Sequence, residues 1–169
     1  MKVYITASSG IGKTAVIEEL KRRGYTAYDA DDRELHLTRL EVADTGEHVE
    51  WPHGYVDWHY YSWNADEERL AELLESDETV FLAGLLGNQE KLYHYFDKLV
   101  ALTVNSLEHE RRLRTRPKRS VGDDKQNIQR RLDKYPEHLE KFIQSGFITI
   151  DNNESVEKTA NHILAAISK

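Results

Sequence analysis

The sequence contains no cysteine and no long run of apolar residues. The lack of cysteine excludes disulfides, thiolate nucleophiles and Cys-based zinc or iron–sulfur sites, and it is compatible with a reducing compartment. No stretch approaches the roughly 18 apolar residues of a membrane span, and the start of the chain has none of the features of a secretory signal. We therefore expect a cytoplasmic protein without a membrane partner.

Basic residues are fewer than acidic ones, with 23 Lys and Arg against 30 Asp and Glu, so the net charge is −7. Wholesale binding of nucleic acid is not expected of an acidic chain, because it needs a basic face. The charge is unevenly distributed, however. Residues 111–134 hold ten Lys and Arg against three Asp, so this segment carries +7 and the remainder −14. The basic segment by itself could still contact an RNA strand.

The 169 residues are enough for one domain with a normal core. Apolar segments alternate with helical patterns along the chain. We predict five strands, at residues 3–6, 25–28, 79–83, 99–104 and 147–150. Strands that are apolar throughout and alternate with helices are typical of a parallel sheet covered on both faces. The predicted fold is a single three-layer α/β domain, in which residues 33–63 are irregular and rich in aromatic side chains.

A phosphate-binding loop is predicted between the first strand and the first helix. Residues 7–14 read Ala-x4-Gly-Lys-Thr, with Ala in place of the more usual first Gly. Backbone N–H groups at such a helix start converge on phosphate oxygens. Lys13 is expected to reach the β- and γ-phosphates, and the Thr14 hydroxyl to enter the Mg²⁺ shell. The predicted ATP-binding residues are Ser8, Ser9, Gly10, Ile11, Gly12, Lys13, Thr14, Ala15 and Asn152.

Beyond this loop, the chain resembles small-molecule and nucleotide kinases of the shikimate, gluconate and adenylate kinase type. Asp29-Ala30-Asp31 looks like the Asp-x-Asp of shikimate kinases, where the carboxylates serve the metal and the acceptor hydroxyl. Residues 112–116, Arg-Leu-Arg-Thr-Arg, are similar to the Arg-Leu-x-x-Arg that opens the lid of that family. The resemblance implies a P-loop kinase fold in which 111–134 is a basic lid and Arg112 and Arg116 clamp the phosphates.

The sequence departs from these families in three places. The twin-Gly acceptor loop appears only as the segment 83–87, which contains Gly84 and Gly87, and the Asp-rich metal strand is missing. Residues 33–63 match no known acceptor-binding domain. The Asn-Lys-x-Asp motif of GTPases is also absent. The family resemblance therefore leaves the acceptor unidentified.

Three carboxylates follow the second predicted strand, at the sheet edge where ligands bind in open α/β folds. Asp29 or Asp31 could accept the proton of an acceptor hydroxyl, and Asp29 could hold Mg²⁺ through a water molecule. The alternative is that these residues, Asp32 above all, cap a helix N-terminus.

The aromatic segment 33–63 is predicted to be an acceptor-side flap, in which Trp58 stacks a ring and Arg39 pairs with an anionic or carbonyl group. The alternative is a satellite hydrophobic cluster that packs the flap onto the domain. Gly84 is predicted to border the acceptor. Asn88 is predicted to cap the following helix, and the alternative is that it contacts the acceptor. His53 and His59 have poor zinc spacing.

The function predicted from these features is phosphoryl transfer from Mg²⁺-bound ATP to a small acceptor, for which a nucleoside or nucleotide is one candidate. Two alternatives stay open: a nucleotide-binding regulatory module without acceptor chemistry, and an RNA-end or tRNA kinase that uses the basic segment. The sequence does not identify the acceptor, the preference for ATP or GTP, or the oligomeric state.

Overall fold

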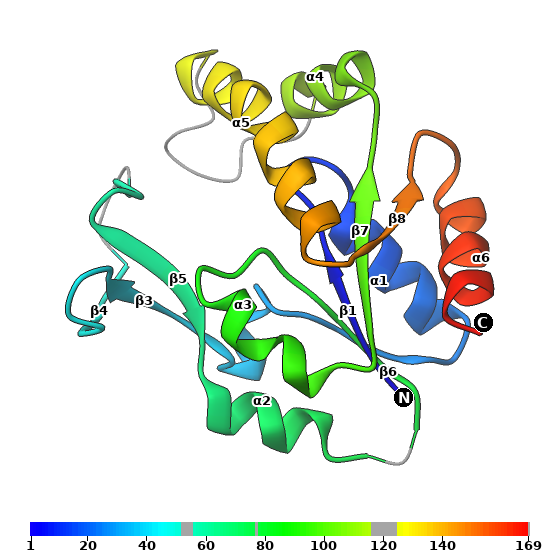
Figure 1. Ribbon diagram of the computed structural model, residues 1–169, viewed down its shortest axis with the longest axis horizontal. Helices are drawn as coiled ribbons and strands as arrows, with labels where there is room; N and C mark the ends of the chain where they lie inside the picture. Colours follow the sequence, from blue (N-terminus) through cyan, green and yellow to red (C-terminus); the bar gives the residue numbers. More distant parts are fainter. Residues whose placement is uncertain (52–55, 77, 116–124, 169) are drawn as a thin grey trace.

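The computed structural model describes residues 1–51, 56–76, 78–115 and 125–168. A five-stranded parallel sheet forms its centre, in the order β2-β6-β1-β7-β8 (Figure 1). The strands are β1 (Lys2–Thr6), β2 (Thr26–Asp29), β6 (Val80–Ala83), β7 (Lys98–Thr103) and β8 (Ile148–Asp151). All five strands predicted from the sequence are present, and the prediction of a parallel sheet is confirmed.

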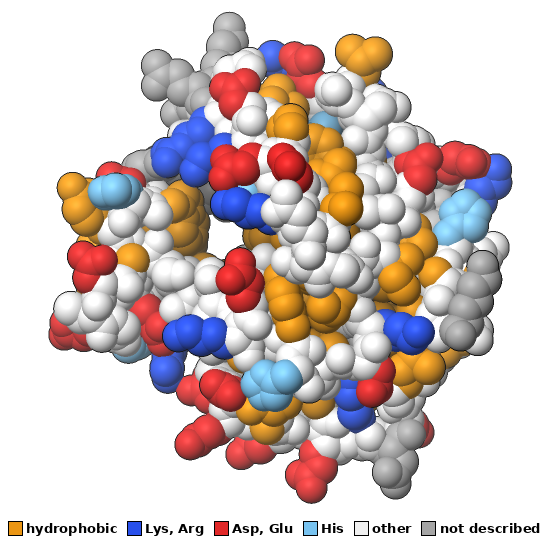
Figure 2. Space-filling view, viewed as in Figure 1, with side chains coloured by type: hydrophobic (Ala, Val, Ile, Leu, Met, Phe, Trp, Pro, Cys, Tyr) orange, Lys and Arg blue, Asp and Glu red, His pale blue; other side chains and the backbone are white. Residues whose placement is uncertain are grey.

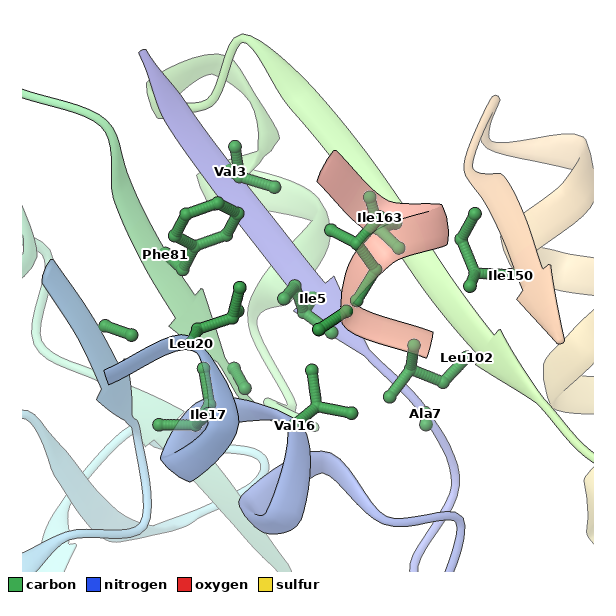
Figure 3. Packing of buried hydrophobic residues seen from close by; sticks show 14 of the residues in the cluster. Val3, Ile5, Ala7, Val16, Ile17, Leu20, Phe81, Leu102, Ile150 and Ile163 are labelled. Carbon is green, nitrogen blue, oxygen red and sulfur yellow. The ribbon is translucent and has the colours of Figure 1, made fainter. Parts of the chain in front are cut away.

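Helices cover both faces of this sheet, so the predicted three-layer arrangement is also confirmed. The helices are α1 (Lys13–Arg22), α2 (Glu67–Leu74), α3 (Gln89–Leu92), α4 (Ser106–Thr115), α5 (Lys125–Gln144) and α6 (Val156–Ile167). Helices α1 and α6 pack on one face, where Ile17 of α1 and Ile163 of α6 belong to the same buried cluster as Ile5 of β1 (Figure 3). Helices α2, α3 and α5 supply the apolar cluster on the opposite face, around Tyr4. None of the described helices is long and apolar enough to cross a membrane.

Residues 33–63, predicted to be irregular, instead contribute a second sheet. Its strands are β3 (Thr38–Val42), β4 (His48–Val49) and β5 (Tyr61–Ala65), antiparallel in the order β4-β3-β5. The turn between β3 and β4 includes Gly46 at φ 71°, a conformation that favours glycine. The prediction was wrong because β3 and β5 pair across 18 or more intervening residues, which no local pattern reveals. This small sheet stands beside the main one (Figure 1).

A buried carboxylate joins the two helices on the α1 face. Glu19 is only 5% exposed and accepts hydrogen bonds from Arg22 and Arg23. Arg23 in turn donates to the Asn161 side chain and to the Glu157 carbonyl, both on α6. The hydrogen bonds from these arginines lower the pKa of Glu19 from 4.5 to about 2, and the bond from Arg22 has the largest effect. The ionised carboxylate is therefore favoured in the folded chain.

The Glu19→Gln variant should be less stable than the wild type near neutral pH, because glutamine cannot accept both charged donors equally well. Since the folded-state pKa is depressed, the contribution is present above about pH 4.5 and is lost as the pH falls towards 2. Urea unfolding at several pH values measures this. Glu18→Gln, which removes a solvent-exposed pair with Lys21 on the same helix, should change stability little. A stability difference for Glu19→Gln that stayed constant from pH 7 to pH 3 would contradict this account.

Candidate active site

The phosphate loop lies between β1 and α1, as the sequence predicted. Gly10 and Gly12 have φ angles of 87° and 116°, in the region that favours glycine. Both also face close neighbours: a Cβ at Gly10 would lie 2.6 Å from Leu113 Cδ2, and one at Gly12 would lie 2.8 Å from Asn152 Nδ2. These two glycines are therefore required by backbone conformation and by space.

Side chains of helix α4 and of Asn152, the residue after β8, form hydrogen bonds with the backbone of the phosphate loop. His109 Nε2–H donates to the Ser9 carbonyl at 2.9 Å. The Ile11 carbonyl accepts from Arg112 Nη1 at 2.5 Å and from Asn152 Nδ2 at 2.7 Å. On α5, His138 Nδ1 lies 3.1 Å from the Ser8 hydroxyl. The loop conformation is therefore fixed by side chains from three distant segments.

The sequence did not indicate the contacts of His109 and His138. His109 precedes the Arg-Leu-x-x-Arg similarity of residues 112–116, and His138 follows the basic segment 111–134, so neither belonged to a motif. Burial lowers the pKa of each imidazole below its ordinary value, so both are neutral at pH 7. Leu113, which lies close to Gly10 of the loop, is four residues after His109 and therefore on the same face of the helix. This spacing was the one feature of the sequence that could have placed His109 against the loop.

Lys13 and Thr14 open α1 at the centre of the site. Lys13 Nζ donates to the Ala7 carbonyl at 2.6 Å, so the side chain folds back over the loop. The Thr14 hydroxyl donates to Asp29 Oδ2 at 2.7 Å, and Asp29 Oδ1 accepts from the backbone N–H of Asp31 at 3.1 Å. A hydroxyl and a carboxylate thus meet at the end of the phosphate loop, and Mg²⁺ prefers such oxygen ligands.

The two carboxylates that follow Asp29 have different partners. Asp31 Oδ1 accepts the indole N–H of Trp63 at 2.9 Å, which directs this carboxylate towards the small sheet. Asp32 caps the short 3₁₀ helix Arg33–Leu35 by accepting from the Glu34 N–H. For Asp32 the structure therefore shows the capping arrangement, whereas Asp29 and Asp31 lie beside the phosphate loop and the aromatic cluster.

Three tryptophans form a continuous cluster beside Asp31. The Trp63 and Trp51 rings are 5.5 Å apart with an interplanar angle of 86°, and the Trp51 and Trp58 rings are 6.2 Å apart at 64°. Trp51 and Trp58 are each 48% exposed. The molecule is hollowed between the small sheet and the remaining body (Figure 2). The cluster therefore offers solvent-accessible ring surface next to a candidate catalytic carboxylate.

Arg39 on β3 pairs with two carboxylates of its own chain. Its Nε donates to Glu41 at 2.6 Å and its Nη1 to Asp66 at 2.9 Å. The second oxygen of Glu41 accepts from Asn64 Nδ2 at 2.6 Å. The interaction with Glu41 raises the pKa of Arg39. The structure thus places the residue expected to meet the acceptor inside a polar network within the small sheet.

The loop after β6 lies next to the Asp29–Asp31 turn. A Cβ at Gly84 would be 3.0 Å from the Ala30 Cβ, and the Ala30 N–H donates to the Ala83 carbonyl at 2.7 Å. The buried Tyr4 hydroxyl donates to the Gly84 carbonyl at 3.1 Å. Gly84 therefore lies at the same sheet edge as the carboxylates, as the parallel topology predicts.

Asn88 does not cap helix α3, contrary to the sequence-based prediction. Its side chain makes no capping hydrogen bond. Instead, Asn88 Oδ1 accepts from the Ala65 N–H at 3.0 Å, and Nδ2 donates to the Ala65 carbonyl at 2.8 Å. The Gly87 N–H donates to the Trp63 carbonyl at 2.7 Å. These bonds join β5 to the loop after β6, which fixes the tryptophan cluster relative to the carboxylates.

The basic segment 111–134 is described only in part. Residues 116–124, including the predicted clamp residue Arg116, lie outside the described ranges. Arg112 contacts the phosphate loop and also donates to the Asn152 carbonyl and to Glu108. Hydrogen bonds from Arg111, which has the larger effect, and from Arg112 lower the pKa of Glu108 to about 2. Arg112 therefore links helix α4 to the phosphate loop and to the end of β8.

The comparisons with known proteins agree with this geometry. No protein-family model matches the sequence, and no curated protein matches it by sequence. Solved structures do match. A shikimate kinase from Bacteroides thetaiotaomicron aligns with 15% identity and a TM-score of 0.62, over 100% of this chain and 99% of that one. The chain has the fold of shikimate kinase.

Two further structures support the same fold. A shikimate kinase from Acinetobacter baumannii, solved with shikimate, has 18% identity and a TM-score of 0.62 over 99% of this chain and 92% of that one. A gluconokinase from Sinorhizobium meliloti 1021 has 16% identity and a TM-score of 0.57 over 99% and 91%. At these identities, the likeness extends to the fold of these kinases and not to their acceptors.

Gly87→Ala should disturb this kinase fold where the small sheet joins it. A Cβ at Gly87 would lie 1.9 Å from Ser62 Oγ and 2.6 Å from Asn64 Oδ1, so β5 must shift. We expect a loss of about 1–3 kcal/mol in the free energy of unfolding, measured by urea denaturation. The double variant Gly87→Ala/Ser62→Ala removes the closest clash and should recover part of the loss. Equal stability of the two variants would show that the clash is not the cause.

Proposed function

We propose that the protein is an ATP- and Mg²⁺-dependent kinase that phosphorylates a hydroxyl of a small, ring-containing acceptor such as a nucleoside. The observation that carries this proposal is the continuous series formed by Thr14, Asp29, Asp31 and Trp63. Thr14 bonds Asp29, the Asp29 side chain bonds the Asp31 backbone, and the Asp31 side chain bonds Trp63. This series runs from a phosphate loop to an exposed aromatic surface.

The nucleotide end of the site is proposed to be the loop Ser8–Ala15 together with Asn152. Lys13 would exchange its bond to the Ala7 carbonyl for contact with the β- and γ-phosphates. The hydroxyl of Thr14 and, through a water molecule, the carboxylate of Asp29 would hold Mg²⁺, which when bound neutralises phosphate charge. No described group of three or more His, Asp or Glu side chains offers a protein-only metal site, and a nucleotide-dependent site does not need one.

The acceptor end is proposed to lie between Asp31 and the tryptophan cluster, bordered by Gly84. Asp31 takes the proton of the acceptor hydroxyl while the hydroxyl oxygen forms a bond to the γ-phosphorus. The bond between that phosphorus and the bridging oxygen breaks, and ADP leaves. The ring of Trp58 contacts the acceptor ring. Arg39 keeps its two ion pairs and contributes by holding the small sheet in place.

The basic segment 111–134 is proposed to act as a lid. Phosphoryl transfer requires positioning and neutralisation of charge, and closure excludes water as a competing nucleophile. Arg112 is already held against the phosphate loop, and Arg116 follows it four residues later in the sequence. In the described part of the segment, Arg111 and Arg114 pair with glutamates of α4. This internal pairing reduces the positive charge that the exposed side of α4 would offer to an RNA backbone.

A screen for acceptor-dependent ADP production tests the proposed function. Nucleosides, sugars and small acids are each incubated with Mg²⁺-ATP, with the Lys13→Ala protein as control. We expect at least one ring-containing alcohol to stimulate ADP release and to gain a phosphoryl group, detected by mass spectrometry. ATP binding without stimulation by any compound would instead indicate a regulatory module. Stimulation by RNA ends alone, falling steeply with added salt, would indicate an RNA kinase.

A further inference from the structure

The small sheet has no spare cation for an anionic acceptor. Arg39 is the one Lys or Arg in strands β3, β4 and β5. Its guanidinium is engaged by Glu41 and Asp66 at 2.6 and 2.9 Å. A carboxylate or phosphate on the acceptor would meet a guanidinium whose positive charge is already balanced by these two carboxylates. The network therefore disfavours acceptors with a negative charge.

The residues before, within and after the small sheet are also acidic overall. Residues 29–66 contain ten Asp and Glu against two Lys and Arg, a net charge of −8. The described parts of the basic segment, residues 111–115 and 125–134, hold seven Lys and Arg against one Asp, and Arg112 of this segment contacts the phosphate loop. The positive end suits the phosphates of ATP, and the negative end suits a ligand without negative charge. Asp31 adds a carboxylate at the junction, where one of its oxygens bonds Trp63.

The tryptophans add a second, independent feature. All three tryptophans of the chain lie in this cluster. The contacts between the rings are edge-on, and Trp51 and Trp58 remain half-exposed. The face of an indole ring attracts ammonium groups, and such contacts contribute most when the cation is removed from water. Exposed indole rings next to a carboxylate are a suitable arrangement for binding an amine.

We propose that the acceptor is a ring-containing alcohol that also carries a positively charged amino group. The amino group contacts the tryptophan faces, and the alcohol lies at Asp31. This inference rests on the proposed kinase function and narrows it, because it selects amino alcohols and excludes nucleotides and hydroxy acids. The decisive observations are the internal pairing of Arg39 and the half-exposed rings of Trp51 and Trp58, which are joined to Asp31 through Trp63.

The test uses three probes that share a benzyl alcohol and differ in charge: 4-(aminomethyl)benzyl alcohol, benzyl alcohol and 4-(hydroxymethyl)benzoate. Because all three tryptophans lie in the cluster, tryptophan fluorescence reports binding there without turnover. N-acetyltryptophanamide corrects for collisional quenching. We expect the amine to bind about 2- to 30-fold more tightly than the neutral alcohol, and the benzoate to bind most weakly. Raising NaCl from 50 to 500 mM should weaken binding of the amine selectively.

Variants of Trp58 separate an aromatic contact from simple packing. Trp58→Phe keeps a ring face, whereas Trp58→Leu keeps apolar volume only. Because Trp58 is half-exposed, neither change should prevent folding, which circular dichroism verifies. We expect Trp58→Leu to lose most of the preference for the amine over the neutral alcohol, and Trp58→Phe to retain part of it. Equal loss in both variants, or tighter binding of the benzoate by the wild type, would overturn the inference.

ADP production with the same three probes distinguishes this inference from the proposed function. Turnover that favours the benzoate would overturn the charge preference while supporting the kinase. Preferential binding of the amine, without ADP production from any amino alcohol, would support the charge preference and contradict the kinase. Preferential binding and turnover of the amine would support both.

Discussion

Lys13→Ala should lower kcat for phosphoryl transfer by about 10²–10³-fold or more, because it removes a positive charge from the point where negative charge develops. The Lys13 ammonium bonds the Ala7 carbonyl in the loop, and in the proposed mechanism it exchanges this bond for contact with the β- and γ-phosphates. The helix that begins at this residue is anchored by buried Val16, Ile17 and Leu20, which the substitution does not touch. Activity should therefore fall much more than stability, and steady-state kinetics with a urea denaturation curve measures both.

Lys21→Ala is the matched control for this variant. Lys21 lies on the same helix and pairs with Glu18 at the surface, an interaction worth about 0–1 kcal/mol. The control should leave both kcat and KM for ATP unchanged within about twofold. Phosphoryl transfer at the wild-type rate by the Lys13→Ala protein would remove this loop from the mechanism.

The main sheet was predictable because burial on both faces leaves a strong local pattern. Strand β6 reads Val-Phe-Leu-Ala with all four residues buried, and such a run, alternating with helical patterns, is typical of a parallel strand covered on both faces. The phosphate loop was predictable because its chemistry demands glycine at fixed spacing, which Gly10 and Gly12 supply. In both cases a few adjacent residues carry the whole signal.

The small sheet was not predictable because its stability depends on distant partners. Strand β4 is only His48–Val49, too short for a periodic pattern. Strand β5 is held by the Gly87 N–H and by the side chain of Asn88. An asparagine before a helix has the same sequence signature whether it caps that helix or bonds a strand, so the neighbouring backbone decides.

The candidate site likewise contains contacts that the sequence could predict and contacts that it could not. The proximity of Thr14 and Asp29 follows from parallel strands, whose carboxyl ends share one edge of the sheet. The pairing of Arg39 with Glu41 and Asp66 does not follow, because it depends on the side-chain directions of a sheet that the sequence did not reveal. An arginine in an acidic, aromatic segment is compatible with a contact to a ligand or with ion pairs inside the protein. The observed ion pairs favour the second interpretation.

The substitutions Asp29→Asn and Asp31→Asn should both reduce kcat, but in ways that separate their roles. Asp31→Asn removes the proposed proton acceptor, which should lower kcat by about 10²–10⁴-fold without changing the Mg²⁺ requirement. Asp29→Asn keeps an oxygen that can accept from the Thr14 hydroxyl but removes the charge that favours the metal. Its activity should recover partly as Mg²⁺ is raised, and a titration of rate against Mg²⁺ measures the difference.

Asp32→Asn completes the series as a control within the same turn. Asp32 caps the helix Arg33–Leu35 through the Glu34 N–H, and asparagine caps about as well as aspartate. This variant should therefore keep its kcat and its Mg²⁺ dependence. If Asp31→Asn needed more Mg²⁺ while Asp29→Asn did not, the two roles would be exchanged. The proton acceptor would then be the carboxylate bonded to Thr14, and the acceptor would have to lie closer to the phosphate loop than to the tryptophans.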